Sequence, residues 1–193
     1  LANLAVCYAQ SGKKTLLIDA DLRRPGLTAL MRMRHLDGLS RVLRGESRVV
    51  DSATALIQAS GVENLDILPC GIRPTNPAEL LAGSRFAELI DWAIGIYDQI
   101  LIDSPPALAT SDAAVVGRQV DGVIMVVQPD KNRRRAVMRA VEGLLGLRIA
   151  LLGLVLNRVH SEKDRGYYGY GYEYGYGYGH GDGGDLAAED TAG

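Results

Sequence analysis

Three aspartates follow short apolar runs and have the chemistry to hold a metal ion. Asp19 and Asp21 lie in "LLIDADLR", and Asp103 lies in "ILIDSPP". Because the carboxyl ends of parallel strands meet at one rim of a sheet, the three carboxylates are predicted to converge. Converging carboxylates repel one another unless a cation joins them, and oxygen ligands suit Mg²⁺ bound together with phosphates. Taken singly, Asp19 could cap a turn and Asp103 could precede a proline-bent loop by chance.

A second feature is a run of tyrosines near the carboxyl terminus. Seven of the nine tyrosines in the chain lie there, at Tyr167, Tyr168, Tyr170, Tyr172, Tyr174, Tyr176 and Tyr178. Glycine at the density of this segment costs too much backbone entropy to order without a partner. We therefore expect residues 160–193 to form a disordered tail.

The elements that would position the aspartates alternate between strands and helices. Apolar runs typical of buried parallel strands occur at 15–19, 65–69, 99–103, 122–128 and 149–157. Helical patterns occur at 1–11, 38–46, 76–97, 111–118 and 132–147. This alternation predicts an α/β fold over residues 1–159, with a doubly wound, mostly parallel sheet and helices on both faces.

Composition narrows the class of protein. The net charge of −2 offers no general attraction to nucleic acid, so no nucleic-acid partner is expected. Cys7 and Cys70 lack partners at metal-binding spacing, which favours reduced thiols in a cytosolic protein. No apolar run approaches the roughly 18 residues that a membrane span needs.

The aspartate motifs together resemble a known family. "LLIDADLR" is similar to the Walker A′ motif of bacterial tyrosine kinases, and "ILIDSPP" is similar to their Walker B motif. The segment "LPCGIRPTNPAELL" and the tyrosine-rich tail resemble the same family. The resemblance implies a P-loop NTPase-like fold that uses ATP and Mg²⁺. It also implies a protein-tyrosine kinase that autophosphorylates its tail and regulates the synthesis and export of exopolysaccharide or capsule.

The resemblance also suggests roles for single residues. Asp19 would be the general base or the acceptor that orients the tyrosine hydroxyl, with Asp21 and Asp103 in the Mg²⁺ sphere, although Asp19 and Asp21 could exchange roles. Arg23 would steady the carboxylates or the transferred phosphate, or else form a loop salt bridge. Asn157 would contact the nucleotide base, or else simply end a strand at a turn.

One part of the family pattern is not found in the chain. The resemblance implies a glycine-rich Walker A loop ending in G-K-[ST] just before "ANLA", and no GxxxxGK[ST] pattern occurs anywhere in the sequence. The backbone N–H groups and the lysine of that loop cradle the β- and γ-phosphates. We therefore expect this chain to be a fragment that is inactive alone, whereas the complete protein binds ATP.

The resemblance finally implies partners and a location. We expect a homo-oligomer in which each tail reaches a neighbouring subunit, a fused or separate membrane-spanning co-polymerase, and a phosphotyrosine phosphatase. The protein would then be cytoplasmic, at the inner face of the plasma membrane. Two alternatives stay open: an ATPase of the MinD and ParA type without kinase activity, and a degenerate, non-enzymatic module whose tail is an interaction segment.

Overall fold

A computed structural model describes residues 1–45 and 47–159 of the chain. Residues Leu1–Arg158 form one compact unit. The predicted tail and all seven of its tyrosines lie outside the described residues, so their disorder and the domain boundary after residue 159 stay predictions.

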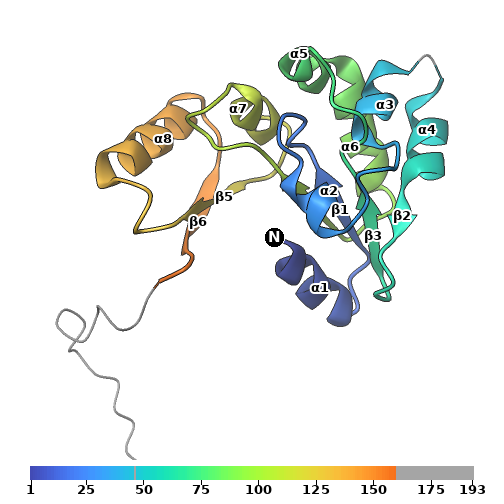
Figure 1. Cartoon of the computed structure of the whole chain (residues 1–193), viewed down its shortest axis with the longest axis horizontal. Coiled ribbons are helices and arrows are strands. Elements are labelled where there is room, and N and C mark those ends of the chain that lie inside the picture. Colours follow the sequence, from blue (N-terminus) through green and yellow to red (C-terminus); the bar gives the residue numbers. More distant parts are fainter. Residues whose placement is uncertain (46, 160–193) are drawn as a thin grey trace, which may run out of the picture. The chain divides into compact units, whose positions relative to one another are not determined.

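The described chain contains both helices and strands, and one or more helices lie between most successive strands (Figure 1). The helices are α1 (Ala2–Gln10), α2 (Gly26–Leu30), α3 (Leu39–Arg44), α4 (Val49–Leu56), α5 (Pro77–Ala82), α6 (Ser84–Ile94), α7 (Asp112–Gly117) and α8 (Arg134–Gly146). The strands are β1 (Thr15–Asp19), β2 (Gln58–Ala59), β3 (Leu65–Leu68), β4 (Gln99–Asp103), β5 (Val123–Val127) and β6 (Leu151–Leu156). All five predicted strands form within two residues of their expected ends, because each is a short apolar run.

The strands form two sheets. In the larger sheet the order is β2-β3-β1-β4, with β1 parallel to both β3 and β4 and with β2 antiparallel to β3. In the smaller sheet β5 and β6 pair in parallel. The predicted α/β class with a mostly parallel sheet is therefore confirmed. Within the described residues, β4 and β5 each pair with one strand only.

Helices cover both faces of the larger sheet, as predicted. Strand β1 is buried along its whole length, and alternate side chains point to opposite faces. Leu16 and Ile18 pack in one cluster with residues of α3, α4 and α6, including Phe86. Leu17 packs on the other face with Ala5 and with side chains of α2. This two-sided burial fixes β1, and with it the aspartate at its end.

The predicted helix over 76–97 is in fact two helices. Gly83 ends α5 in an extended conformation and also caps the start of α6. Pro77 occupies the first turn of α5, where its missing N–H is harmless. Helical spacing on both sides of Gly83 made the sequence look continuous.

Two backbone segments cross closely beside the larger sheet. The N–H groups of Leu39 and Ser40 donate to the carbonyls of Pro69 and Cys70 at 2.8 and 2.9 Å. A Cβ atom added at Gly38 would collide with the carbonyl oxygen of Pro69. This crossing anchors the loop that follows β3.

A search for membrane-spanning helices over residues 1–45 and 47–159 finds none that is long and apolar enough.

Candidate functional site

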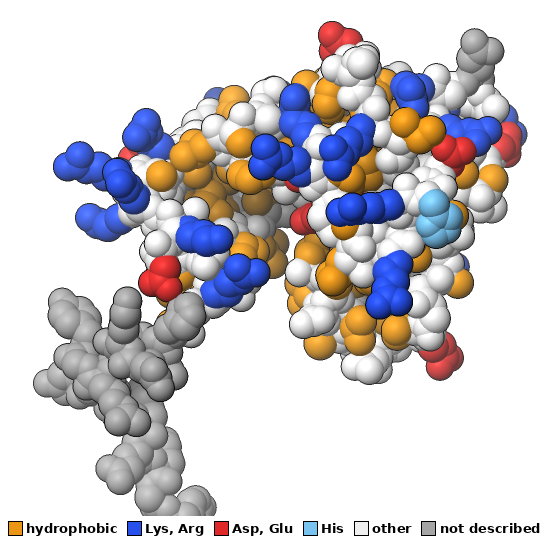
Figure 2. Space-filling view, in the orientation of Figure 1, with side chains coloured by type: hydrophobic (Ala, Val, Ile, Leu, Met, Phe, Trp, Pro, Cys, Tyr) orange, Lys and Arg blue, Asp and Glu red, His pale blue; other side chains and the backbone are white. Residues whose placement is uncertain are grey.

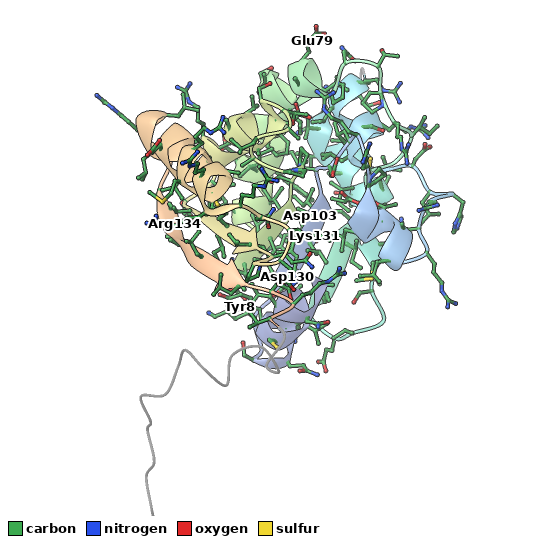
Figure 3. The ribbon with its side chains drawn as sticks, turned by 60° about the vertical axis from the view of Figure 1, so that its left-hand side comes forward. Tyr8, Glu79, Asp103, Asp130, Lys131 and Arg134 are labelled. Carbon is green, nitrogen blue, oxygen red and sulfur yellow. The ribbon has the colours of Figure 1, made fainter. Side chains whose placement is uncertain are left out.

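The ends of β1 and β4 bring two of the predicted aspartates together. In the parallel register Asp19 lies opposite Asp103, and the N–H of Ala20 donates to the carbonyl of Asp103 at 2.9 Å. Figure 3 marks Asp103 at the end of β4. Asp21 follows β1 by two residues, so all three predicted carboxylates lie at this rim of the sheet.

Asp19 is fully buried and already accepts three hydrogen bonds. The N–H and the hydroxyl of Thr28 both donate to Oδ2 at 2.7 Å, and the N–H of Asp21 donates to Oδ1 at 3.1 Å. Burial raises the pKa of the Asp19 carboxyl above its ordinary value, while these hydrogen bonds oppose the rise. Asp19 is therefore held rigidly between β1 and α2.

Asp21 is half-buried, and one of its two carboxylate oxygens accepts hydrogen bonds. The N–H groups of Arg23 and Arg24 donate to its Oδ1 at 3.1 and 2.8 Å. No hydrogen bond to its Oδ2 occurs among the described residues. Of the two Walker A′ aspartates, Asp21 thus has the more accessible carboxylate oxygen.

The pKa of Asp103 is raised by its surroundings, which include the other two carboxylates. Burial and then the negative charges of Asp19 and Asp21 raise its pKa to about 6. Cys70, after β3, experiences the same charges: burial and then Asp19 and Asp21 raise the pKa of its thiol to about 12. The rim is therefore a concentrated negative site, and Cys70 is an unreactive thiol beside it.

These donors fit Mg²⁺. Within the described residues no three His, Cys, Asp or Glu side chains are arranged to hold a metal ion by themselves. Mg²⁺ does not require such a cage, because it is usually bound by one or two carboxylates together with substrate phosphates and waters. Asp21 and Asp103 supply oxygen donors of that kind. The negative charges of Asp19 and Asp21 beside Asp103 are charges that a divalent cation would neutralise.

Arg23 forms an ion pair instead of standing free. Its Nε donates to Oδ2 of Asp112 at 2.7 Å, and its Nη2 donates to Oδ1 at 3.1 Å. Asp112 is fully buried at the start of α7, while the Arg23 side chain is 40% exposed. Of the roles predicted for Arg23, this arrangement matches the salt bridge, and it ties the loop after β1 to α7. A contact with phosphate stays a prediction.

Asn157 directly follows β6. Its N–H donates to the carbonyl of Val127 at 2.8 Å, and its side-chain oxygen accepts from the N–H of Arg158 at 2.9 Å. These bonds match the turn that was predicted as the alternative role. Its contact with a nucleotide base stays a prediction.

Sequence reasoning missed three residues that support the site: Thr28, Cys70 and Asp112. Thr28 joins α2 to Asp19 and also accepts from the N–H of Cys70 at 2.9 Å. Asp112 has a signal that could have revealed it, because the arginine of D-x-D-x-R needs an acid partner and "SDAAVV" places one at a helix start. Thr28 and Cys70 carry no comparable local signal.

Comparison with protein families and curated proteins gives consistent matches. The model of a family described as "AAA domain" matches residues 1–145. Tyrosine-protein kinase YwqD of Bacillus subtilis is 39% identical over 170 residues, which are 87% of this chain and 70% of YwqD. Tyrosine-protein kinase Wzc of Salmonella typhi is 39% identical over 171 residues, and the match covers 86% of this chain but only 23% of Wzc.

Solved structures add the fold. The kinase domain of the Escherichia coli tyrosine kinase ETK matches with a TM-score of 0.76 and 36% identity, over 92% of this chain and 66% of that one. MinD of Pyrococcus horikoshii, solved as a complex with Mg-ADP, matches with a TM-score of 0.65 and 26% identity, over 83% of this chain and 64% of that one.

Proposed function

The chain belongs to the P-loop family of bacterial tyrosine kinases, and on that premise we propose that the complete protein phosphorylates tyrosines of its own tail with MgATP. One observation carries the proposal: Asp19, Asp21 and Asp103 share one rim, where burial and then the charges of Asp19 and Asp21 raise the pKa of Asp103 to about 6. A site of this kind suits Mg²⁺ with a polyphosphate. The acceptors would be the seven tyrosines between Tyr167 and Tyr178.

Each carboxylate would have a distinct part in the reaction. When bound, Mg²⁺ would neutralise charge on the phosphates and help to align the transferred group. Asp103 would hold it, directly or through water. The hydroxyl oxygen of tyrosine would attack the γ-phosphorus as the bond to ADP breaks, and a carboxylate would accept the hydroxyl proton.

The geometry favours one of the two assignments that the sequence left open. Both oxygens of Asp19 already accept hydrogen bonds in a buried setting, which suits an anchor better than a base. Asp21 has an oxygen without a hydrogen bond within the described chain, so Asp21 is the better-placed acceptor for the tyrosine proton. Asp19 would then act by holding Asp21, through the bond from the Asp21 N–H.

The phosphate cradle would come from residues of the complete protein that precede Leu1. Two features support this part of the proposal. In the described region β4 and β5 each lack a strand partner on one edge, and a parallel strand could pair there. Apolar side chains on β5 and β6, such as Val126 and Leu152, are 61% and 68% exposed, although parallel strands are usually covered on both faces. The chain alone would therefore be inactive.

Phosphorylation of the tail would regulate assembly. An extended run of twelve residues reaches at most about 40 Å, far enough to enter a neighbouring subunit of a homo-oligomer. Seven phosphotyrosines would add about −10 to −14 charges, which an acidic site and neighbouring tails would repel. The phosphorylated tails would then dissociate from the neighbouring subunits, and the oligomer would separate into subunits. Removal of the phosphates by a phosphotyrosine phosphatase would allow the oligomer to form again.

Similarity to the family supports a proposal for the wider role. We propose that the kinase regulates exopolysaccharide or capsule synthesis and export. It would act at the cytoplasmic face of the plasma membrane, through a fused or separate membrane-spanning co-polymerase. The likeness to MinD supports a second candidate, an ATPase that hydrolyses ATP without phosphorylating protein.

Phosphotyrosine mapping separates these candidates. The complete protein, including residues before Leu1, would be incubated with MgATP and digested for mass spectrometry. We expect phosphate on the tyrosines of residues 167–178, and its loss in Asp103→Asn. ADP release without phosphotyrosine would instead support the ATPase. Phosphotyrosine that persists at wild-type level in Asp103→Asn would refute the assigned site.

A further inference from the structure

Helix α8 carries a cluster of arginines that the proposed catalytic site does not use. The cluster, here called the α8 arginine surface, consists of Arg133, Arg134, Arg135 and Arg139, all of them exposed. Figure 2 shows Lys and Arg side chains gathered over the α8 end of the molecule, and Figure 3 marks Arg134 on that helix.

The arginines of this surface take part in no ion pair among the described residues. Ion pairs among the described residues involve Arg23 and Arg41, and none involves an arginine of α8. Helix α8 also begins without a side-chain cap and without an acidic residue in its first turn. Its exposed N–H groups add positive potential to that of the guanidinium groups. An anion would relieve this concentration of positive charge.

The shape of the surface suits one kind of anion. Arg134, Arg135 and Arg139 line a shallow hollow of about 480 Å³ together with Met138 and Glu142. The Met138 side chain is 45% exposed there. Guanidinium groups bind phosphate oxygens in a two-pronged manner, and a methionine side chain packs well against an aromatic ring. Phosphotyrosine presents both groups, and Glu142 would limit how far an anion extends along the helix.

We propose that the α8 arginine surface binds the tyrosine-phosphorylated form of the chain's own tail, residues 160–193. Charge complementarity supports this occupant. The tail has seven acidic and two basic residues, a net charge of −5, whereas residues 1–159 have 19 basic and 16 acidic residues, a net charge of +3. Phosphorylation would add about −1.5 to −2 charges at each tyrosine.

The strand order places the end of β6 beside the end of β5, one loop before this surface. β6 runs parallel to β5, with Leu156 opposite Val127, and the N–H of Asn157 donates to the carbonyl of Val127. Six residues of chain lead from Val127 to Arg133, so the two positions lie at most about 20 Å apart. Tyr167 follows Val159 by eight residues, a reach of up to about 28 Å. A tail can therefore bind α8 of its own subunit.

An anionic membrane is the competing occupant, and the surface fits it less well. Stable binding of a helix to a membrane surface requires a broad apolar face beside the basic one. Met138 and Leu145 are the large apolar side chains exposed on the described α8, at 45% and 55%, and of these two Met138 lines the hollow with the arginines. The placing of Met138 among the arginines suits a phosphate group on an aromatic ring better.

The regulatory consequence rests on the proposed kinase function. A tail held on its own α8 after phosphorylation is unavailable to the catalytic site of a neighbour. The arginine surface would thus stabilise the separated subunits, in addition to the repulsion between phosphorylated tails.

Peptide binding tests this proposal without requiring kinase activity. A fluorescent synthetic peptide of residues 169–179, made with and without phosphate on Tyr172 and Tyr174, would be titrated with the unphosphorylated 193-residue chain. Anisotropy would give the affinity of each peptide. The test variant is Arg134→Gln with Arg135→Gln, and the matched control is Arg32→Gln with Arg34→Gln, another pair of exposed arginines. Circular dichroism would check that both variants fold.

We expect the phosphopeptide to bind at least about tenfold more tightly than its unmodified form. One hydrogen bond between a guanidinium group and a phosphate oxygen is enough to change the affinity by about tenfold. The α8 variant should lose about tenfold in affinity for it, while the control stays within about twofold. Equal binding of both peptides, or an unaffected α8 variant, would overturn the proposal. Arginine-dependent binding to phosphatidylglycerol vesicles without preference for the phosphopeptide would also overturn it, in favour of a membrane surface. Failure of the kinase function would leave these affinities unchanged.

Discussion

Replacing Asp103 by asparagine should stabilise the fold while removing activity. Burial and the charges of Asp19 and Asp21 raise the pKa of Asp103 from 3.8 to about 6. At neutral pH the protein therefore carries a carboxylate whose ionised form opposes folding. A pKa rise of this size corresponds to a loss of about 3 kcal/mol in the free energy of unfolding, as an upper limit. Because Asp103 is partly exposed, solvent screening reduces the expected gain to about 1–2 kcal/mol.

The sign of the pH dependence follows from proton linkage. A carboxyl with a raised pKa binds its proton more tightly in the folded state, so stability increases as pH falls through about 6. As pH falls, the free energy of unfolding of the wild-type protein should approach that of the Asp103→Asn variant. Near pH 5 the difference between the two free energies should be roughly half its value at neutral pH. Below the ordinary pKa of aspartate the difference should vanish.

Urea unfolding of the 193-residue chain without Mg²⁺ would measure this difference at about pH 7.5 and about pH 5. The fluorescence of Trp92, the one tryptophan of the chain, reports unfolding because it packs against the core. Asp121→Asn, at an exposed position, is the control and should change stability by less than about 0.5 kcal/mol. The reasoning would be refuted if the Asp103→Asn variant were less stable than wild type at about pH 7.5. It would also be refuted if the difference in free energy of unfolding between variant and wild type were the same at both pH values.

Three further predictions concern residues around the site. Thr28→Val, which keeps the side-chain shape but removes the hydroxyl donor to buried Asp19, should destabilise the fold by about 1–3 kcal/mol in urea unfolding. Gly38→Ala should lower the thermal unfolding midpoint, at a cost of about 1–3 kcal/mol, because a Cβ there meets a backbone carbonyl; an unchanged midpoint would contradict the crossing. Iodoacetamide at mildly alkaline pH should modify exposed Cys7 and spare buried Cys70, whose raised pKa keeps it a thiol; equal labelling by mass spectrometry would contradict its placement.

The sequence predicted the strands well because their signal is local. Each expected strand is a short apolar run, and β1 and β4 end at the aspartates that the motifs identify. Helix boundaries were less certain, as the break at Gly83 shows. The short helices α2 and α4 and the antiparallel strand β2 were not predicted. They depend on packing against the sheet more than on a strong periodicity of their own.

The candidate site was predictable in its acids and not in their surroundings. Asp19, Asp21 and Asp103 were expected at one rim because parallel strands end there together. Two of the three bonds that immobilise Asp19 come from Thr28, nine residues further along the chain, and the partner of Arg23 lies 89 residues away. Contacts between residues so far apart depend on the folded arrangement. That arrangement is also what favours Asp21 over Asp19 as the proton acceptor.

The central claim is that these carboxylates serve transfer of phosphate to tyrosine. The most direct test is to measure ADP and phosphotyrosine in the same reaction of the complete protein with MgATP. The account predicts that phosphotyrosine forms in step with ADP in wild type and in Asp121→Asn, and that both products disappear in Asp103→Asn. ADP that accumulates in wild type without phosphotyrosine would contradict it.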